Sequence, residues 1–398
     1  MSVGVASLSD LNESIILRDE MTDPLLLPIL GLAVGSFVVS WVLTLAMIRI
    51  APRIGFVDKP GHRKIHSNPK PLGGGVAIFI AFALPMLAAL LAIHLKLVPL
   101  DHPNWDKYAG GVIQQTPLAA TLLGALLMIH IMGLIDDRKA LGPYIKLIVQ
   151  LVVAAMIVVP FKDVRALTAL GNAPSTILTI CWITAITNAF NFLDNMDGLS
   201  SGVAAVCTTA FLITAILIQQ WFVAATLALL LGALLGFLWW NFPPAKIFMG
   251  DSGSLVIGFI LGVMTIRTTY LPKGQNLGAG WYSVFVPVIV LALPLYDLVV
   301  VSIIRISRGK SPFVGDTNHF SHRLVARGMS RRTTVLCLYL VTASTAIAAI
   351  LLPHVRTQFE AILIFVQTLL VLGVVALLEQ HPLPMPPEQT NSDHGTNR

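Results

Sequence analysis

The sequence TILTICWITAITNAFNFLDNMDGLSSGVAAVCTTAFLITAILIQ, residues 176–219, decides the fold. It contains two apolar runs, Thr176–Leu193 and Leu199–Gln219, each close to the length that crosses ~30 Å of hydrocarbon. A polar turn with two carboxylates, Asp194 and Asp197, joins them. An aspartate near mid-membrane costs about 2.5 to 3.5 kcal/mol, and ionisable groups in such places usually mark sites. A solvated turn needs only one such residue, so the sequence favours a functional site at a membrane boundary.

The composition of the whole chain agrees with this interpretation. Hydrophobic residues make up 56% and charged residues 12%, against about 25% charged in soluble domains. The continuous apolar runs exclude a transmembrane barrel, whose strands alternate over about ten residues. We therefore predict an all-α polytopic integral membrane protein with about eleven transmembrane helices: Leu25–Ile50, Leu72–Leu95, Thr116–Ile135, Pro143–Pro160, Thr176–Leu193, Leu199–Gln219, Trp221–Trp240, Ser254–Tyr270, Ser283–Ile304, Thr333–Pro353 and Phe359–Leu378.

The placement of basic residues predicts the orientation. Most of the 26 lysines and arginines fall in the connections after odd-numbered spans, which are therefore cytoplasmic by the positive-inside rule. This puts the amino-terminal segment 1–24 outside, a transmembrane domain over 25–378, and a Pro-rich disordered tail, 379–398, in the cytoplasm. The net charge of +6 is then a topology signal, and no nucleic-acid partner is expected. The three cysteines show no disulfide or zinc spacing.

Five polar clusters fall on the predicted cytoplasmic side. They are DKPGHRKIHSNPKPLGGG (58–75), GLIDDRKALGPYIK (133–146), NAFNFLDNMDGLSSG (188–202), NFPPAKIFMGDSGS (241–254) and RISRGKSPFVGDTNHFSHRL (305–324). The outer connections hold no comparable concentration of Asp, His, Gly and Asn. This asymmetry favours a catalytic face over a transport path, although a secondary transporter stays as the alternative from another class.

The acidic residues of these clusters predict a metal-assisted site. The adjacent carboxylates Asp136 and Asp137 repel each other by about 4 kcal/mol at an effective dielectric near 20, which a divalent cation relieves. The alternative is a solvated turn neutralised by Arg138 and Lys139. Oxygen ligands suit Mg²⁺, with Mn²⁺ also possible, held through one or two carboxylates plus substrate phosphates. The implied substrate is a phosphate or a pyrophosphate.

Cationic residues supply the other half of such a site. His319, His322 and Arg323 follow the ninth span, Lys146 follows the acidic pair, and His66 lies in the first loop. These groups can hold a pyrophosphate and stabilise charge that develops on phosphoryl oxygens. We attribute Arg327, Arg331 and Arg332 to the positive-inside rule instead.

Together the five clusters resemble the polyprenyl-phosphate N-acetylhexosamine-1-phosphate transferase superfamily of bacterial inner membranes, the family-four glycosyltransferases. The first loop is similar to the pattern D-x-P-x-x-R-K-x-H-x-x-P-x-P-x-x-G-G of the members that initiate O-antigen, enterobacterial common antigen and teichoic acid linkage units, and the chain most resembles the undecaprenyl-phosphate N-acetylglucosamine-1-phosphate transferases. It is less similar to the phospho-MurNAc-pentapeptide transferases, which stay as an alternative. The other matched elements are N-x-x-N-x-x-D-G-x-D-G-L from Asn188 to Leu199, F-x-G-D-x-G-S from Phe248 to Ser254, and H-x-H-H from His319 to His322.

The resemblance implies a reaction and roles for the residues. A sugar 1-phosphate would pass from a UDP-N-acetylhexosamine to undecaprenyl phosphate in the membrane lipid, with release of UMP. Asp251 and Asn191 would hold Mg²⁺, and Asp136 and Asp137 would deprotonate the acceptor phosphate or support the metal. The phosphates would contact Lys146, His319, His322 and Arg323, and the nucleotide would be framed by Asp194, Asp197, Asn241, Phe248 and His66.

Two residues depart from the family pattern. Asn195 stands where the pattern has its first Gly, and Ser321 replaces the middle histidine. The first departure bears on the fit of the base and the second on the pyrophosphate contacts. The sequence leaves open the identity of the sugar, the downstream polymer, a covalent or direct mechanism, and whether the chain forms a homodimer.

Overall fold

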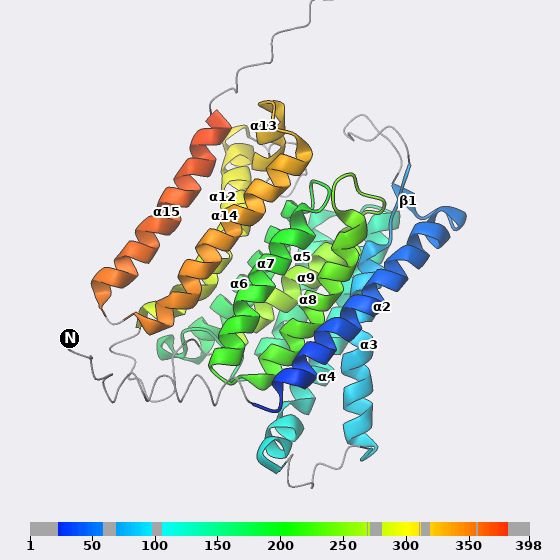
Figure 1. Ribbon diagram of the computed structural model, residues 1–398, viewed down its shortest axis with the longest axis vertical. Helices are drawn as coiled ribbons and strands as arrows, with labels where there is room; N and C mark the ends of the chain where they lie inside the picture. The colour runs from blue at the N-terminus through cyan, green and yellow to red at the C-terminus, as the bar shows by residue number, and fades with distance from the viewer. Residues whose placement is uncertain are drawn as a thin grey trace, which may run out of the picture.

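The computed structural model describes residues 23–58, 69–97, 106–268, 270, 281–309, 311, 319–355 and 357–380. Figure 1 shows a bundle of long helices with one small hairpin at one end. The elements are, in chain order, α2 (Leu26–Arg53), β1 (Val57–Asp58), β2 (Lys70–Pro71), α3 (Gly74–His94), α4 (Asp106–Arg138), α5 (Pro143–Val158), η1 (Thr168–Leu170), α6 (Asn172–Leu193), α7 (Leu199–Leu217), α8 (Trp221–Asn241), α9 (Asp251–Arg267), η2 (Trp281–Phe285), α11 (Val286–Val290), α12 (Ala292–Ser307), α13 (Phe320–Ala326), α14 (Arg331–Leu351), η3 (Leu352–His354) and α15 (Gln358–Gln380).

The predicted polytopic helical architecture is confirmed. Each of the eleven predicted segments coincides with helix, and among the described residues eight helices are long and apolar enough to span a membrane. A further pair of helices, Tyr282–Val290 and Ala292–Ser307, is bent by 70° and adds a ninth if the pair is counted as one span. The bend precedes Pro294, which cannot donate a backbone hydrogen bond and whose ring crowds the preceding turn. Helices α5 and α9 are shorter, with 16 and 17 residues, so the count of eleven spans stays a prediction.

The two-residue strands β1 and β2 are an exception to the all-α class. They pair antiparallel, with Val57 opposite Pro71.

The orientation of the termini stays a prediction. The segments 1–24 and 379–398 lie almost wholly outside the described residues.

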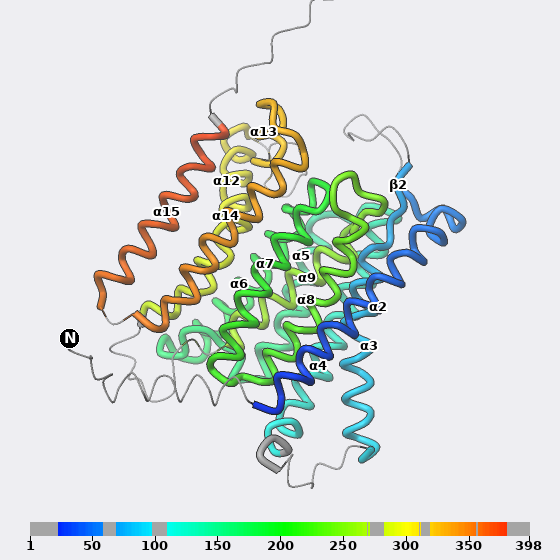
Figure 2. The backbone as a smooth tube through the Cα atoms, in the orientation of Figure 1, coloured from blue at the N-terminus to red at the C-terminus, as the bar shows by residue number. Residues whose placement is uncertain are grey.

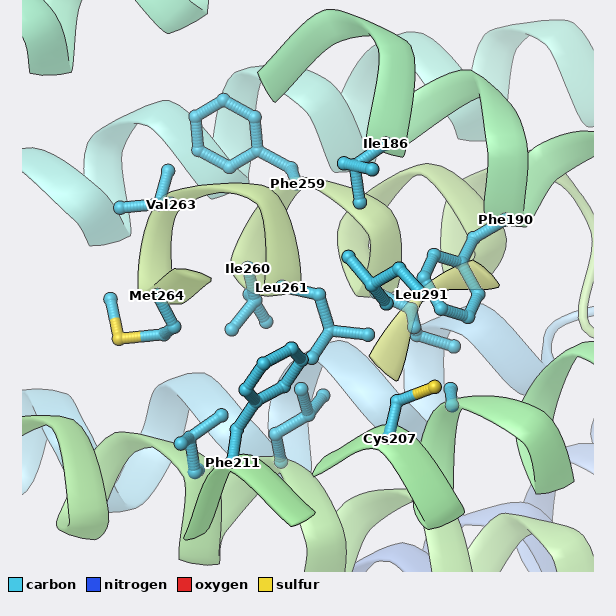
Figure 3. Packing of buried hydrophobic residues seen from close by; sticks show 14 of the residues in the cluster. Ile186, Phe190, Cys207, Phe211, Phe259, Ile260, Leu261, Val263, Met264 and Leu291 are labelled. Atoms are coloured by element: carbon cyan, nitrogen blue, oxygen red, sulfur yellow. The ribbon is translucent and has the colours of Figure 1, made fainter. Parts of the chain in front are cut away.

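Helix α9 forms the centre of the bundle. Its residues from Ser252 to Thr265 are all buried, and α3, α4, α6, α7 and α8 pack around it. Figure 3 shows Phe259, Leu261 and Met264 of α9 in one buried cluster with Ile186 and Phe190 of α6 and Phe211 of α7. A helix that is apolar on all sides is expected to be buried in this way.

Glycines allow α9 to approach its neighbours closely. A Cβ at Gly258 would lie 2.7 Å from Thr187 Cα of α6, and one at Gly133 of α4 would lie 2.5 Å from Ser252 Cα. The second contact brings the acidic end of α4 against the first turn of α9. Helices α12, α14 and α15 form one edge of the bundle, and α2 and α3 form the opposite edge, as the backbone trace in Figure 2 shows.

Candidate active site

A polar cavity opens at the end of the bundle that carries the hairpin and α13, uppermost in Figure 1. Its volume is about 540 Å³, within the range of about 300 to 1,000 Å³ that is usual for small-molecule sites. All five polar clusters contribute to its lining, which comprises Asp58, Lys70, Leu72, Asp136, Asp137, Asp194, Asn195, Met196, Asp197, Asn241, Pro244, Phe248, Met249, Gly250, Asp251, His322 and Arg331.

Backbone hydrogen bonds hold the first loop against the α8–α9 loop. Phe248 N donates to Pro71 O at 2.9 Å, and Gly74 N donates to Phe248 O at 3.1 Å. Lys70 Nζ reaches the same loop and donates to Ala245 O at 2.5 Å. These bonds hold the α8–α9 loop beside β2, with Phe248 in the wall of the cavity.

The first turn of α9 is fixed by Asp137. Its Oδ1 accepts a hydrogen bond from Asp251 N at 2.7 Å, and its Oδ2 accepts one from Ser252 N at 3.2 Å. The first amides of a helix have no partner within the helix and carry partial positive charge, so a carboxylate there is stabilising. Asp137 thus sets the position of Asp251 in the cavity.

Asp251 is held from two further sides. Lys146 Nζ donates to its Oδ2 at 2.7 Å, and Asn191 Nδ2 donates to its Oδ1 at 2.9 Å. Lys146 also lies 3.3 Å from Asp136 Oδ2, so one ammonium group bridges two carboxylates. Asp136 Oδ1 accepts a hydrogen bond from Leu141 N at 2.7 Å. One connected network therefore joins Asp136, Asp137, Asp251, Lys146 and Asn191.

The turn between α6 and α7 adds two more carboxylates. Burial, and then the neighbouring carboxylates of Asp251, Asp137 and Asp197, raise the pKa of Asp194 well above its ordinary value. Repulsion of this kind favours the binding of a cation. Asp197 Oδ2 accepts a hydrogen bond from Ala245 N at 2.9 Å, which ties this turn to the α8–α9 loop.

The donor set fits a magnesium ion by its chemistry. Among the described residues, no three Asp, Glu, His or Cys side chains converge as a complete metal-binding group. Mg²⁺ does not need such a group, because it usually keeps several waters and is bound through one or two carboxylates together with substrate phosphates. The oxygen-rich wall around Asp251 meets that requirement.

The predicted phosphate-binding residues separate in the structure. His322 lines the cavity. His319 is 5% exposed, and its Nδ1 lies 2.7 Å from Asp297 Oδ2 of α12. Arg323 forms an ion pair with Glu379 at the end of α15. Neither His319 nor Arg323 belongs to the lining, so their predicted contacts with phosphate stay predictions.

Asn241 lines the cavity, but its amide is used within the protein. Its Oδ1 accepts hydrogen bonds from Gly198 N and Ser201 Oγ, and its Nδ2 donates to Ile247 O. Its predicted nucleotide contact would have to compete with these three bonds. His66, predicted to lie at the nucleotide, falls outside the described residues.

Two cationic residues that line the cavity, Lys70 and Arg331, were not predicted from the sequence. Arg331, which we had assigned to membrane topology, begins α14 and lines the cavity. The positive-inside rule accounts for any arginine on the cytoplasmic side, so the sequence carried no signal that set Arg331 apart from Arg332. Arg332 instead donates from Nε to Pro243 O at 2.8 Å.

Comparison with known proteins agrees with this geometry. Residues 119–269 match the model of glycosyl transferase family 4. The chain is 32% identical to a probable undecaprenyl-phosphate N-acetylglucosaminyl 1-phosphate transferase of Bacillus subtilis, over 87% of this chain and 91% of that protein. It is also 32% identical to a decaprenyl-phosphate N-acetylglucosaminephosphotransferase of Mycolicibacterium smegmatis, over 87% and 85%. An undecaprenyl-phosphate alpha-N-acetylglucosaminyl 1-phosphate transferase of Escherichia coli K12 is 26% identical over 76% and 78%.

Proposed function

The chain belongs to glycosyl transferase family 4 and is a phosphoglycosyl transferase, and we propose that it transfers N-acetylglucosamine 1-phosphate from UDP-N-acetylglucosamine to undecaprenyl phosphate. The product would be a lipid-linked pyrophosphate sugar, the first membrane step of a cell-envelope polysaccharide. One observation carries the proposal: a single cavity brings Asp136, Asp137 and Asp251 together with His322 and the cation Arg331. This is the charge arrangement that a reaction between two phosphates requires.

The proposed reaction is a displacement at phosphorus. An oxygen of the acceptor phosphate forms a bond to the β-phosphorus of the donor, and the bond from that phosphorus to the bridging oxygen breaks, so that UMP leaves. Phosphoryl transfer depends mainly on positioning and electrostatic stabilisation. Asp251 and Asn191 would hold Mg²⁺, which when bound offsets negative charge on the pyrophosphate.

The chain's own residues supply the remaining tasks. Asp137 fixes the start of α9 through two backbone amides, so it acts as a positioning residue. Lys146 pairs with both Asp136 and Asp251 and so keeps the two carboxylates together. In the proposed reaction these carboxylates accept the proton of the acceptor phosphate or support the metal. His322 and Arg331 can contact the donor phosphates, and Phe248 can stack on the base.

The site would face the cytoplasm of a bacterial inner membrane. The proposal rests on the positive-inside pattern and on the gathering of the polar clusters at one end of the bundle. A single cysteine introduced at Lys139, in the α4–α5 connection, should react with a membrane-impermeant maleimide only after the membrane is permeabilised. Labelling in intact cells would contradict this orientation.

Turnover is the direct test of the activity. Purified protein should release UMP from UDP-N-acetylglucosamine when undecaprenyl phosphate and Mg²⁺ are present, and a chelator should stop the release. Other UDP-N-acetylhexosamines and UDP-MurNAc-pentapeptide form the comparison panel. Asp251→Asn should abolish turnover, whereas Asp163→Asn should not, because Asp163 pairs with Arg267 away from the cavity. The proposal fails if the wild-type protein releases no UMP from any donor in the panel.

A further inference from the structure

The two residues that depart from the family pattern contact each other. Ser321 Oγ donates a hydrogen bond to Asn195 Oδ1 at 2.5 Å, although 126 positions separate the two residues in the chain. A glycine at 195 has no side chain to accept this bond. A histidine at 321 would need more space than a serine that is 0% exposed occupies. The two departures are therefore physically linked.

Asn195 is itself fixed in place. Its Nδ2 donates to Phe192 O at 2.8 Å in the last turn of α6, so both ends of the amide are engaged. The Phe192 ring packs edge-on against the His319 ring, with centroids 6.0 Å apart. Asn195 thus joins the α6–α7 turn to the start of α13.

Helix α13 depends on such contacts for its position. It has seven residues, and helices this short are not stable alone in water. His319, just before it, is held by Asp297 of α12 at 2.7 Å, and Ser321 is held by Asn195. The next residue, His322, lines the cavity, as Asn195 does.

We infer that Asn195 and Ser321 act as one positioning pair for the donor: their hydrogen bond holds α13 on the α6–α7 turn and keeps the His322 ring at the phosphates of a nucleoside diphosphate sugar. This inference rests on the proposed function. It assigns to the two departures a shared role in donor binding, with no direct part in the displacement.

A double-mutant cycle on the full-length protein tests the pair. Asn195→Ala and Ser321→Ala should each raise KM for UDP-N-acetylglucosamine by about twofold to tenfold, the net effect of one hydrogen bond, with kcat changed less. The loss in the double variant should be smaller than the sum of the two single losses, because each single variant already lacks the Asn195–Ser321 bond and this bond can be lost only once. Ser321→Thr, which keeps the hydroxyl, should retain most of the affinity. Ser307→Ala, a hydroxyl at the end of α12 outside the cavity lining, is the matched control.

The outcomes separate this inference from the proposed function. If the wild-type protein shows no turnover, the proposed function is refuted. If the wild-type protein is active and the effects of Asn195→Ala and Ser321→Ala on KM simply add in the double variant, only the positioning pair is refuted. Variants whose thermal unfolding midpoint falls while KM stays constant would show a purely structural contact and would also overturn the inference. If either alanine variant fails to fold, the KM of Ser321→Thr decides: a value near wild type supports the pair, and a tenfold increase contradicts it.

Discussion

Asp137 caps the helix that carries Asp251, because its Oδ1 accepts the Asp251 amide at 2.7 Å and its Oδ2 accepts the Ser252 amide at 3.2 Å. The relationship joins the two acidic motifs that the sequence keeps more than a hundred residues apart. Asp137 therefore fixes the position of Asp251 in the cavity.

Replacing Asp137 should uncouple α9 from α4. Asp137→Asn keeps one acceptor but turns an N–H group toward a backbone N–H, so the cap is half lost. Loss of a helix cap costs about 1 kcal/mol, so a small fall in the thermal unfolding midpoint is expected. Turnover should fall much further, by about a hundredfold, since small displacements at a reacting centre are costly. Asp163→Asn is the control, and equal turnover in the two variants would contradict the assigned role.

Removing the Lys146 ammonium should alter the response to Mg²⁺. Lys146→Met leaves Asp136 and Asp251 without their shared cation, so the repulsion between the carboxylates grows and a divalent ion binds more tightly. We expect half-maximal UMP release at a lower Mg²⁺ concentration, together with a kcat reduced at least tenfold. Titrating Mg²⁺ against the initial rate measures both. An unchanged Mg²⁺ midpoint would place the metal away from this pair of carboxylates.

Donor affinity should depend on pH through His322. Burial, and then the charges of His319 and Arg331, lower the pKa of His322 below its ordinary value, so the ring is neutral in the empty site at pH 7. A bound pyrophosphate favours the protonated ring and raises its pKa. Binding then takes up a proton between the two pKa values, and affinity falls as pH rises through that window, by at most tenfold per pH unit. Equilibrium binding of UDP-N-acetylglucosamine at pH 6, 7 and 8 measures this slope, which His322→Gln should flatten.

Arg331 should contribute more to donor binding than its place in the sequence suggests. Arg331→Gln removes a cation from the cavity lining, and charge-assisted contacts to phosphate are stronger than neutral ones. We expect about a tenfold increase in KM for the donor. Arg53→Gln removes the same charge from the exposed end of α2 and should leave KM unchanged. Equal effects of the two substitutions would mean that Arg331 acts only through overall charge.

The parts of this molecule that sequence could predict follow from local patterns. Apolar length predicted where α2, α6, α7 and α8 lie, because the bilayer sets a length that each helix meets alone. The grouping of Asp136 with Asp251 followed from topology, which places loops on a common side. No local pattern reveals the ion pair between Arg323 and Glu379, because Glu379 lies at the far end of α15. The Asn195–Ser321 bond was hidden for the same reason, since it joins two separate loops.

Restoring the family pattern at these two positions should reveal their dependence on each other. Ser321→His alone inserts a ring at a position that is 0% exposed and lies 2.5 Å from Asn195, and overpacking of this kind commonly costs about 1 to 3 kcal/mol. We therefore expect a lower unfolding midpoint and a strongly reduced affinity for UDP-N-acetylglucosamine. Asn195→Gly in the same chain removes the side chain that the ring would meet, so the double variant should recover part of both properties. The unfolding midpoint and the donor affinity are measured for the two single variants and the double variant. If the two positions were independent, the decreases caused by the single substitutions would simply add in the double variant, which would contradict the dependence.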